Sequence, residues 1–156
     1  MRYLGFVGLM LMWVSCQDKK DNTLDAYDTV SAIEVEKVEV TDAMFGMGCM
    51  TEYSLKGTQD LIFSQGGSKD EKGWVTYMKI NGQQEVFFST NDIIVSEGEN
   101  KFSMQLENKN YWVIIDATVG EVYMESDASI ASGTLKVIDK KTKEEKIFEF
   151  EGGTAC

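Results

Sequence analysis

The chain offers few residues for acid–base or nucleophilic chemistry, because its 156 residues include no histidine. No Ser-His-Asp or Cys-His catalytic site can therefore be built, and no histidine-ligated zinc, copper or haem site. Proton transfer would fall to carboxylates, and the candidates are Asp116, Glu121, Glu125 and Asp127. A glycosidase needs two carboxylates roughly 5–9 Å apart. The alternative, which we favour, is that these are solvated charges of an acidic domain.

Two stretches contain side chains of the types that bind metal ions. Asp92, Glu97 and Glu99 could supply oxygen ligands to Ca²⁺, but their spacing matches no recognised loop such as the EF-hand. Residues 44–50 hold three methionines, two glycines and Cys49, and thioether and thiolate ligands suit Cu(I). The structural alternative is a flexible apolar plug with glycines that allow close backbone approach. We favour it, and we predict no metal and no cofactor.

The first sixteen residues have the layout of a secretory signal. Arg2 supplies the positive start, residues 3–14 are mainly apolar, and Ser15 is the small residue before Cys16. The apolar run is shorter than the roughly 20 residues that cross a bilayer. The chain becomes polar and charged directly after Cys16. These features predict an exported protein in which residues 1–15 are a signal peptide.

The segment Trp13-Val14-Ser15-Cys16 resembles the lipobox of bacterial lipoproteins, although Trp13 stands where that family usually has a leucine-like residue. The resemblance implies cleavage before Cys16 and acylation of this cysteine, which would anchor the protein in a membrane. Lipoproteins with aspartate after the cysteine are often kept at the inner membrane, so Gln17 favours the outer membrane. The polar stretch 17–21 is similar to the leader of lipoproteins from the Bacteroidetes group. The expected location is the cell envelope, on its periplasmic or surface face.

Acylation of Cys16 would leave two cysteines, Cys49 and Cys156. Exported proteins mature in an oxidising compartment, where an even pair of cysteines favours a disulfide. This bond would join Cys49, near the start of the domain, to Cys156. The alternative is two free thiols, but without a histidine or a Cys-x-x-Cys motif a redox role has little support.

The elements that would position these residues are short apolar runs at intervals of roughly ten residues, with turn signals between them. The clearest signal is Asn81-Gly82 between residues 74–80 and 84–89, which predicts a tight hairpin with a type I′ turn. A last hairpin is expected from residues 134–138 and 146–150. We therefore predict an all-β fold, an antiparallel barrel or sandwich of eight or nine short strands.

The predicted organisation is a signal peptide, a lipidated cysteine with a flexible polar tether at residues 16–30, and one all-β domain at residues 31–156. Residues 127–133 are mostly small and are expected to form a loop.

At the end of that expected loop, Ile130-Ala131-Ser132-Gly133-Thr134 is similar to the Ala-Ser-Gly element of the membrane-bound inhibitors of C-type lysozyme. In that family a serine-containing loop enters the lysozyme active site. The resemblance implies that Ser132 and Gly133 belong to a partner-binding loop. The segment that follows the element in that family is absent, because Leu135-Lys136-Val137-Ile138 stands in its place.

The formal charge of −11 argues against nucleic acid as a partner and suits a basic protein, or serves solubility alone. The leading hypothesis is a lipid-anchored, non-enzymatic binding or structural module of the cell envelope, which meets the membrane through lipid on Cys16. The alternatives are an inhibitor of a basic hydrolase such as a C-type lysozyme, and a carboxylate-based enzyme.

Overall fold

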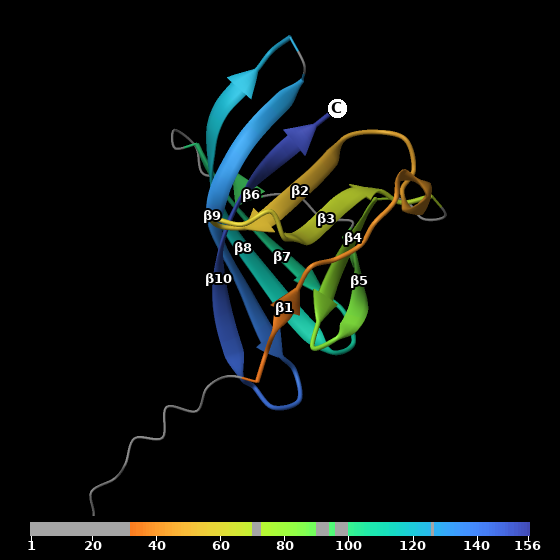
Figure 1. Cartoon of the computed structure of the whole chain (residues 1–156), viewed down its shortest axis with the longest axis vertical. Helices are drawn as coiled ribbons and strands as arrows, with labels where there is room; N and C mark the ends of the chain where they lie inside the picture. The colour runs from red at the N-terminus through yellow and green to blue at the C-terminus, as the bar shows by residue number, and fades with distance from the viewer. Residues whose placement is uncertain (1–31, 70–72, 90–93, 96–99, 126) are drawn as a thin grey trace, which may run out of the picture.

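The computed structural model describes residues 32–69, 73–89, 94–95, 100–125 and 127–156. Within these residues the chain forms strands and a single short 3₁₀ helix (Figure 1). In chain order the elements are β1 (Val35–Glu36), η1 (Asp42–Met44), β2 (Met50–Leu55), β3 (Leu61–Gly67), β4 (Trp74–Ile80), β5 (Gln83–Ser89), β6 (Ile94–Val95), β7 (Lys101–Glu107), β8 (Tyr111–Tyr123), β9 (Ala128–Asp139) and β10 (Glu145–Ala155).

All the described strands belong to one antiparallel sheet, so the predicted all-β antiparallel fold is confirmed. The order is β1-β4-β3-β2-β10-β9-β8-β7-β6, and β5 also pairs with β4. The described part has ten strands rather than eight or nine, and β1 and β6 have two residues each. The sheet is strongly curved, so that its two halves face each other (Figure 1). Strand pairing among the described residues does not close it into a barrel.

Side chains link the two halves of the sheet at β5 and β7, which are not paired among the described residues. The buried Glu85 on β5 accepts hydrogen bonds from two asparagine side chains of the β7–β8 turn, Asn108 Nδ2 at 2.7 Å and Asn110 Nδ2 at 3.0 Å. Asn108 Nδ2 also donates to the Val86 carbonyl at 3.3 Å. A buried carboxylate is costly unless it is hydrogen-bonded, so this seam both satisfies Glu85 and holds β5 near β7.

The Asn81-Gly82 hairpin is confirmed. β4 and β5 pair from Ile80↔Gln83 to Trp74↔Ser89, and the two turn residues have φ of 49° and 78°. Positive φ at both central positions defines the type I′ turn, and Asn and Gly tolerate it best.

The predicted loop at residues 127–133 is wrong, because residues 128–133 belong to β9. Gly133 pairs with Ala117 of β8 on one side and with Phe150 of β10 on the other. A Cβ atom at Gly133 would lie 2.0 Å from the Asp116 carbonyl oxygen. The small residues that suggested a loop are needed here because neighbouring backbones come unusually close.

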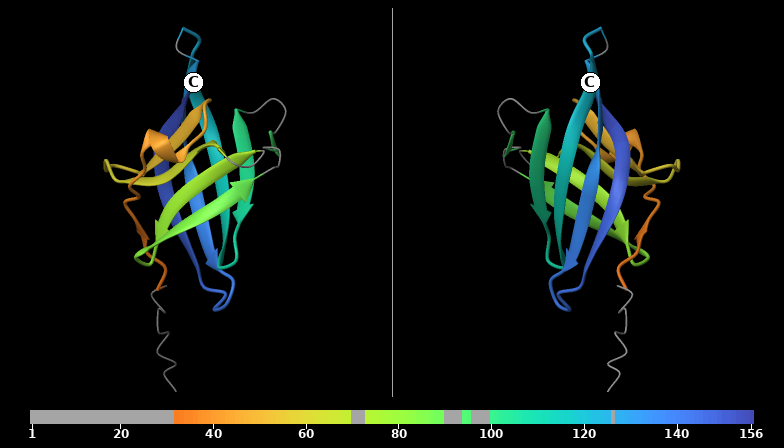
Figure 2. Two further views of the ribbon diagram at one scale, coloured as in Figure 1. Left: turned by 90° about the vertical axis from the view of Figure 1, so that its right-hand side faces the viewer. Right: turned by 90° about the vertical axis from the view of Figure 1, so that its left-hand side faces the viewer.

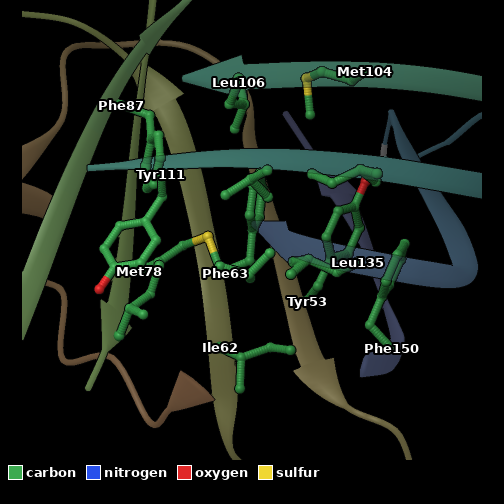
Figure 3. Packing of buried hydrophobic residues seen from close by; sticks show 14 of the residues in the cluster. Tyr53, Ile62, Phe63, Met78, Phe87, Met104, Leu106, Tyr111, Leu135 and Phe150 are labelled. Carbon is green, nitrogen blue, oxygen red and sulfur yellow. The ribbon is translucent and has the colours of Figure 1, made fainter. Parts of the chain in front are cut away.

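The core lies between the two halves of the curved sheet, and its side chains come from nearly every long strand (Figure 3). Tyr53 of β2 stacks between Phe63 of β3 and Phe150 of β10, with ring centroids 5.0 and 4.2 Å apart. Leu135 of β9 and Ile115 of β8 are also fully buried. Long strands with alternating inward apolar residues therefore enclose an interior filled with side chains.

The domain has two ends, which we name by their place on the chain. The proximal end carries Ala32, where the described chain begins, with the β4–β5 and β9–β10 turns (Figure 2). Hydrogen bonds from Asn81 N to Glu34 O and from Lys140 N to Asn110 O join these turns to their neighbours. The distal end carries the β8–β9 turn and Cys156 (Figures 1 and 2). The long strands β8, β9 and β10 run from one end to the other.

Candidate functional site: a groove at the distal end

Cys49 and Cys156 are bonded to each other, as the sequence predicted. The bond joins the segment between η1 and β2 to the residue that follows β10. β2 and β10 are already paired here, from Phe150↔Leu55 to Ala155↔Met50. The disulfide therefore fixes the distal end of this strand pair and holds the preceding segment against it.

The methionine-rich segment is anchored by its aromatic residue. Phe45 is buried, contacts Tyr77 edge-on with ring centroids 5.3 Å apart, and covers Gly66, where a Cβ atom would lie 2.7 Å from the Phe45 ring. Met47, by contrast, is fully exposed. The expected apolar plug exists, but Phe45 rather than methionine forms it. Since Cys49 is oxidised, it offers no thiolate to Cu(I).

An open groove of about 920 Å³ lies next to the disulfide, on the outer face of β2, β10 and β9. One side consists of β2, its loop to β3 and the segment before β2. The other side is β9. The lining residues are Asp42, Gly48, Met50, Glu52, Ser54, Gln59 and Leu61 on the first side, Ser129 and Ile130 on the second, and residues 152–156 between them.

On the outer face of β10 the floor of the groove is bare at Gly153, which pairs with Glu52 and Ile130, whereas Gly152 lies on the inner face with its partners Tyr53 and Ala131. A Cβ atom at Gly152 would lie 2.0 Å from the Glu52 carbonyl oxygen, and one at Gly153 would lie 2.1 Å from the Ser129 carbonyl oxygen. Neither position can accept a side chain without movement of a neighbouring strand. On the opposite face the hydroxyls of Thr51 and Thr154 share a hydrogen bond of 2.8 Å, which keeps β2 and β10 together beneath the floor.

Apolar and acidic side chains meet along this groove. Ile130, which is 44% exposed, and Met50 and Leu61 provide apolar surface. The carboxylates of Asp42 and Glu52 belong to exposed residues, and Glu52 Oε1 accepts a long hydrogen bond of 3.4 Å from Ser64 Oγ. A ligand lying here would meet aliphatic surface and negative charge within one site.

The β8–β9 hairpin beside the groove also exposes large apolar residues at its tip, namely Val122, Tyr123 and Met124. Tyr123 donates a hydrogen bond of 2.7 Å from its hydroxyl to Glu121, and this bond is the main reason why the pKa of Tyr123 is raised. The other large apolar residues that are exposed in the described part are Met47, in the segment before β2, and Trp74, Phe88 and Ile147, on β4, β5 and β10. The distal end is therefore the place where several of them come together.

The four carboxylates considered for acid–base chemistry are all exposed. Asp116 lies in the middle of β8, whereas Glu121 lies near its end and Glu125 and Asp127 lie in the turn that follows. Glu121 lies five residue steps along the strand from Asp116, which is about 16 Å at ~3.3 Å per step. Asp116 is therefore not paired with the other three, and the arrangement is that of solvated charges.

The residues expected to form a partner-binding loop, Ser132 and Gly133, lie inside β9. Ser132 pairs with Thr118 and Glu151, and Gly133 with Ala117 and Phe150. A residue held between two strands cannot project as a loop into another protein's active site. The lipidation candidate Cys16 and the calcium candidates Asp92, Glu97 and Glu99 lie outside the described residues.

A smaller cleft of about 410 Å³ lies at the proximal end, lined by residues 109–111 and 139–141. Its Lys140 donates to Glu107 at 3.1 Å and to the Asn108 carbonyl at 2.5 Å, and its ammonium lies 4.9 Å from the centre of the Trp112 ring. The Lys140 hydrogen bond is the main cause of the lowered pKa of Glu107. This cation is engaged within the domain, so the cleft is a weaker ligand site than the distal groove.

No protein-family model, curated protein or solved structure matches this chain. Among the described residues no group of three or more Cys, Asp or Glu side chains is placed to hold a metal ion. No helix in the same part of the chain is long and apolar enough to cross a membrane. The distal groove is therefore interpreted from its own geometry.

The sequence reasoning missed the groove residues, above all Glu52, Ile130 and the Gly152-Gly153 pair. One signal was present, because two adjacent glycines at the end of an alternating strand often mark a place where another backbone or a ligand comes close. The contribution of Ile130 could not be seen, since its position beside β10 depends on β9 being a strand.

Proposed function

We propose that this protein is a lipid-anchored component of the cell envelope and that its β domain is a non-enzymatic binding module with its binding site at the distal groove. The anchoring part rests on the lipobox-like segment ending at Cys16 and on the polar stretch after it. Gln17 supports the outer membrane as the destination. One acyl chain holds a protein only marginally, whereas two or three on one cysteine would hold it stably.

The observation that supports the binding role most strongly is that the groove and the start of the described chain lie at opposite ends of the domain. The described chain begins at the proximal end, and the open groove with its apolar and acidic lining lies at the distal end (Figure 2). An anchor that precedes Ala32 would attach to the domain at the end opposite the groove, so that the groove lies on average farther from the membrane than the proximal turns. The segment from Cys16 to Ala32 could extend at most about 53–58 Å. The filled interior favours binding on this outer face over carriage of a ligand inside the sheet.

The anchoring test is fractionation of cells that produce the native chain or its Cys16→Ser variant. The native protein should sediment with outer-membrane fractions and incorporate labelled palmitate, and the variant should be soluble and unlabelled. A variant that stays in the membrane fraction would refute lipidation at Cys16.

The orientation test compares two single-cysteine reporters, Met124→Cys at the distal end and Thr142→Cys in the β9–β10 turn, each labelled in membranes with a bulky maleimide. The distal reporter should react faster, because the proximal turn would face the lipid. Equal rates, or a faster proximal reporter, would contradict the proposed orientation.

A further inference from the structure

We infer that the distal groove binds an extended segment of a partner protein that carries lysine or arginine side chains. This inference rests on the proposed binding role and specifies the class of partner. It follows from three properties of the groove, which are its width, its lining and the charge of the protein around it.

The width selects an extended chain. The side chains of Met50 and Glu52 on β2 and of Ile130 on β9 flank β10 on either side. Two strand spacings separate these rows, which is about 10 Å. A helix with its side chains has a diameter of about 10–12 Å and would fill this space without room for the side chains that line it. A single extended chain fits between the rows, over the backbone of β10 at Gly153.

The lining selects long cationic side chains. Ile130, Met50 and Leu61 offer aliphatic surface to the stem of a lysine or arginine, and Glu52 and Asp42 offer carboxylates to its charged end. Lysine and arginine commonly bury their stems on apolar surface while the charge stays near solvent or a counter-ion. Glu52 Oε1 accepts from Ser64, and the other oxygen of the same carboxylate can accept from a ligand.

The negative net charge of this protein favours a basic partner over a second copy of the same chain. With a formal charge of −11, two copies that meet at this end would bring like charges together. The same field would attract a basic protein and raise its rate of association. The hairpin next to the groove adds Glu121, Glu125 and Asp127 to this acidic end.

The test uses the full chain with Cys16→Ser and a defined probe, an acetylated and amidated peptide that alternates lysine with valine or threonine. A peptide with glutamate in place of lysine is its counterpart. Binding is followed by ¹⁵N chemical shifts and fluorescence anisotropy. The lysine peptide should bind and shift residues on β2, β9 and β10 around the groove, and the glutamate peptide should not bind.

Two matched pairs of variants distinguish binding of the peptide in the groove from its general electrostatic attraction to an acidic protein. Ile130→Thr is compared with Ile147→Thr, since both isoleucines are about half exposed, at 44% and 55%, and lie on β9 and β10. Glu52→Gln is compared with Glu145→Gln, which changes the net charge by the same amount at the proximal end. The groove variants should weaken binding at least fivefold, and the controls less than twofold.

Equal weakening by the two glutamine variants would overturn the inference, because it would mean that only net charge attracts the peptide. A dimer seen in sedimentation and disrupted by Ile130→Thr would overturn it in favour of a second copy. Neither result depends on Cys16, so the anchoring half of the proposed function stands or fails separately in the fractionation. Circular dichroism on every variant checks that the fold is retained.

Discussion

Replacement of Gly133 by alanine should destabilise the domain far more than a glycine-to-alanine change in a strand normally does. Gly133 pairs with strands on both sides, and a Cβ atom there would lie 2.0 Å from the Asp116 carbonyl oxygen and 2.8 Å from the Ala117 Cα. Real Cβ contacts are longer than 3.0 Å. β8 and β9 would have to move apart by about 1 Å, and in a ladder with ~4.8 Å spacing such a shift breaks or weakens the nearest hydrogen bonds.

The expected size follows from two contributions. Overpacking in a filled core costs about 1–3 kcal/mol, and two weakened backbone hydrogen bonds cost about 1 kcal/mol each. The sum is about 3–5 kcal/mol, a large part of the roughly 5–15 kcal/mol that stabilises a typical domain. Gly120 is the matched control on β8, because the nearest atom to its Cβ position is the Ile130 carbonyl oxygen at 3.7 Å. Alanine there should change stability by less than about 1 kcal/mol.

The assay is urea unfolding of the oxidised chain with Cys16→Ser, followed by tryptophan fluorescence and circular dichroism. Coincident curves from the two probes would justify a two-state free energy. If Gly133→Ala and Gly120→Ala differ by less than about 1 kcal/mol, the close approach of β8 to β9 is not a real constraint, and the explanation for the glycine at position 133 fails.

Three further predictions concern the disulfide, the aromatic core and the seam. Replacing Cys49 and Cys156 together by serine opens a link across 107 positions of sequence, and chain-entropy arguments give a loss of about 4–5 kcal/mol; calorimetry that finds less than about 1 kcal/mol would contradict this. Burial raises the pKa of Tyr53 to about 12, above its value near 10 in an unfolded chain. The folded state therefore binds this proton more tightly, so stability present below pH 10 should fall by about 2–3 kcal/mol as the pH rises to 12. Tyr53→Phe should abolish that part of the pH dependence in urea titrations at pH 9 and 11. Glu85→Gln leaves one asparagine amide of the seam without its acceptor and should cost about 1–3 kcal/mol; an unchanged urea midpoint would show that the seam does not hold β5 to β7.

Local sequence patterns predicted the parts of the fold that depend on local chemistry. Asn81-Gly82 specifies a type I′ turn because the conformation requires positive φ at both residues, and the structure has it. The Cys49–Cys156 pairing was also predicted, since only two cysteines remain once Cys16 is assigned to the anchor. The alternation of apolar and polar residues along Lys101–Glu107 places Met104 and Leu106 inward, as observed.

Patterns of small residues were misread where their reason lay in distant strands. Gly133 looked like a loop residue, yet it is small because Asp116 passes beside it. Gly152 and Gly153 have a similar reason for being small, since a Cβ atom on either would meet the Glu52 or Ser129 carbonyl oxygen. The strand pairings that bring these residues together join segments up to about a hundred positions apart, and no local pattern encodes them.

The sequence by itself determined the all-β class, the tight hairpin, the cysteine pair and the prediction of an anchored, exported protein. These follow from turn chemistry, period-two alternation and the composition of one short segment, and all of them act over a few residues. Only the tertiary structure decided that β8, β9 and β10 run the length of the domain and that a groove forms over β10 at Gly153. A groove exists because separate strands lie side by side, and that proximity is a property of the folded sheet.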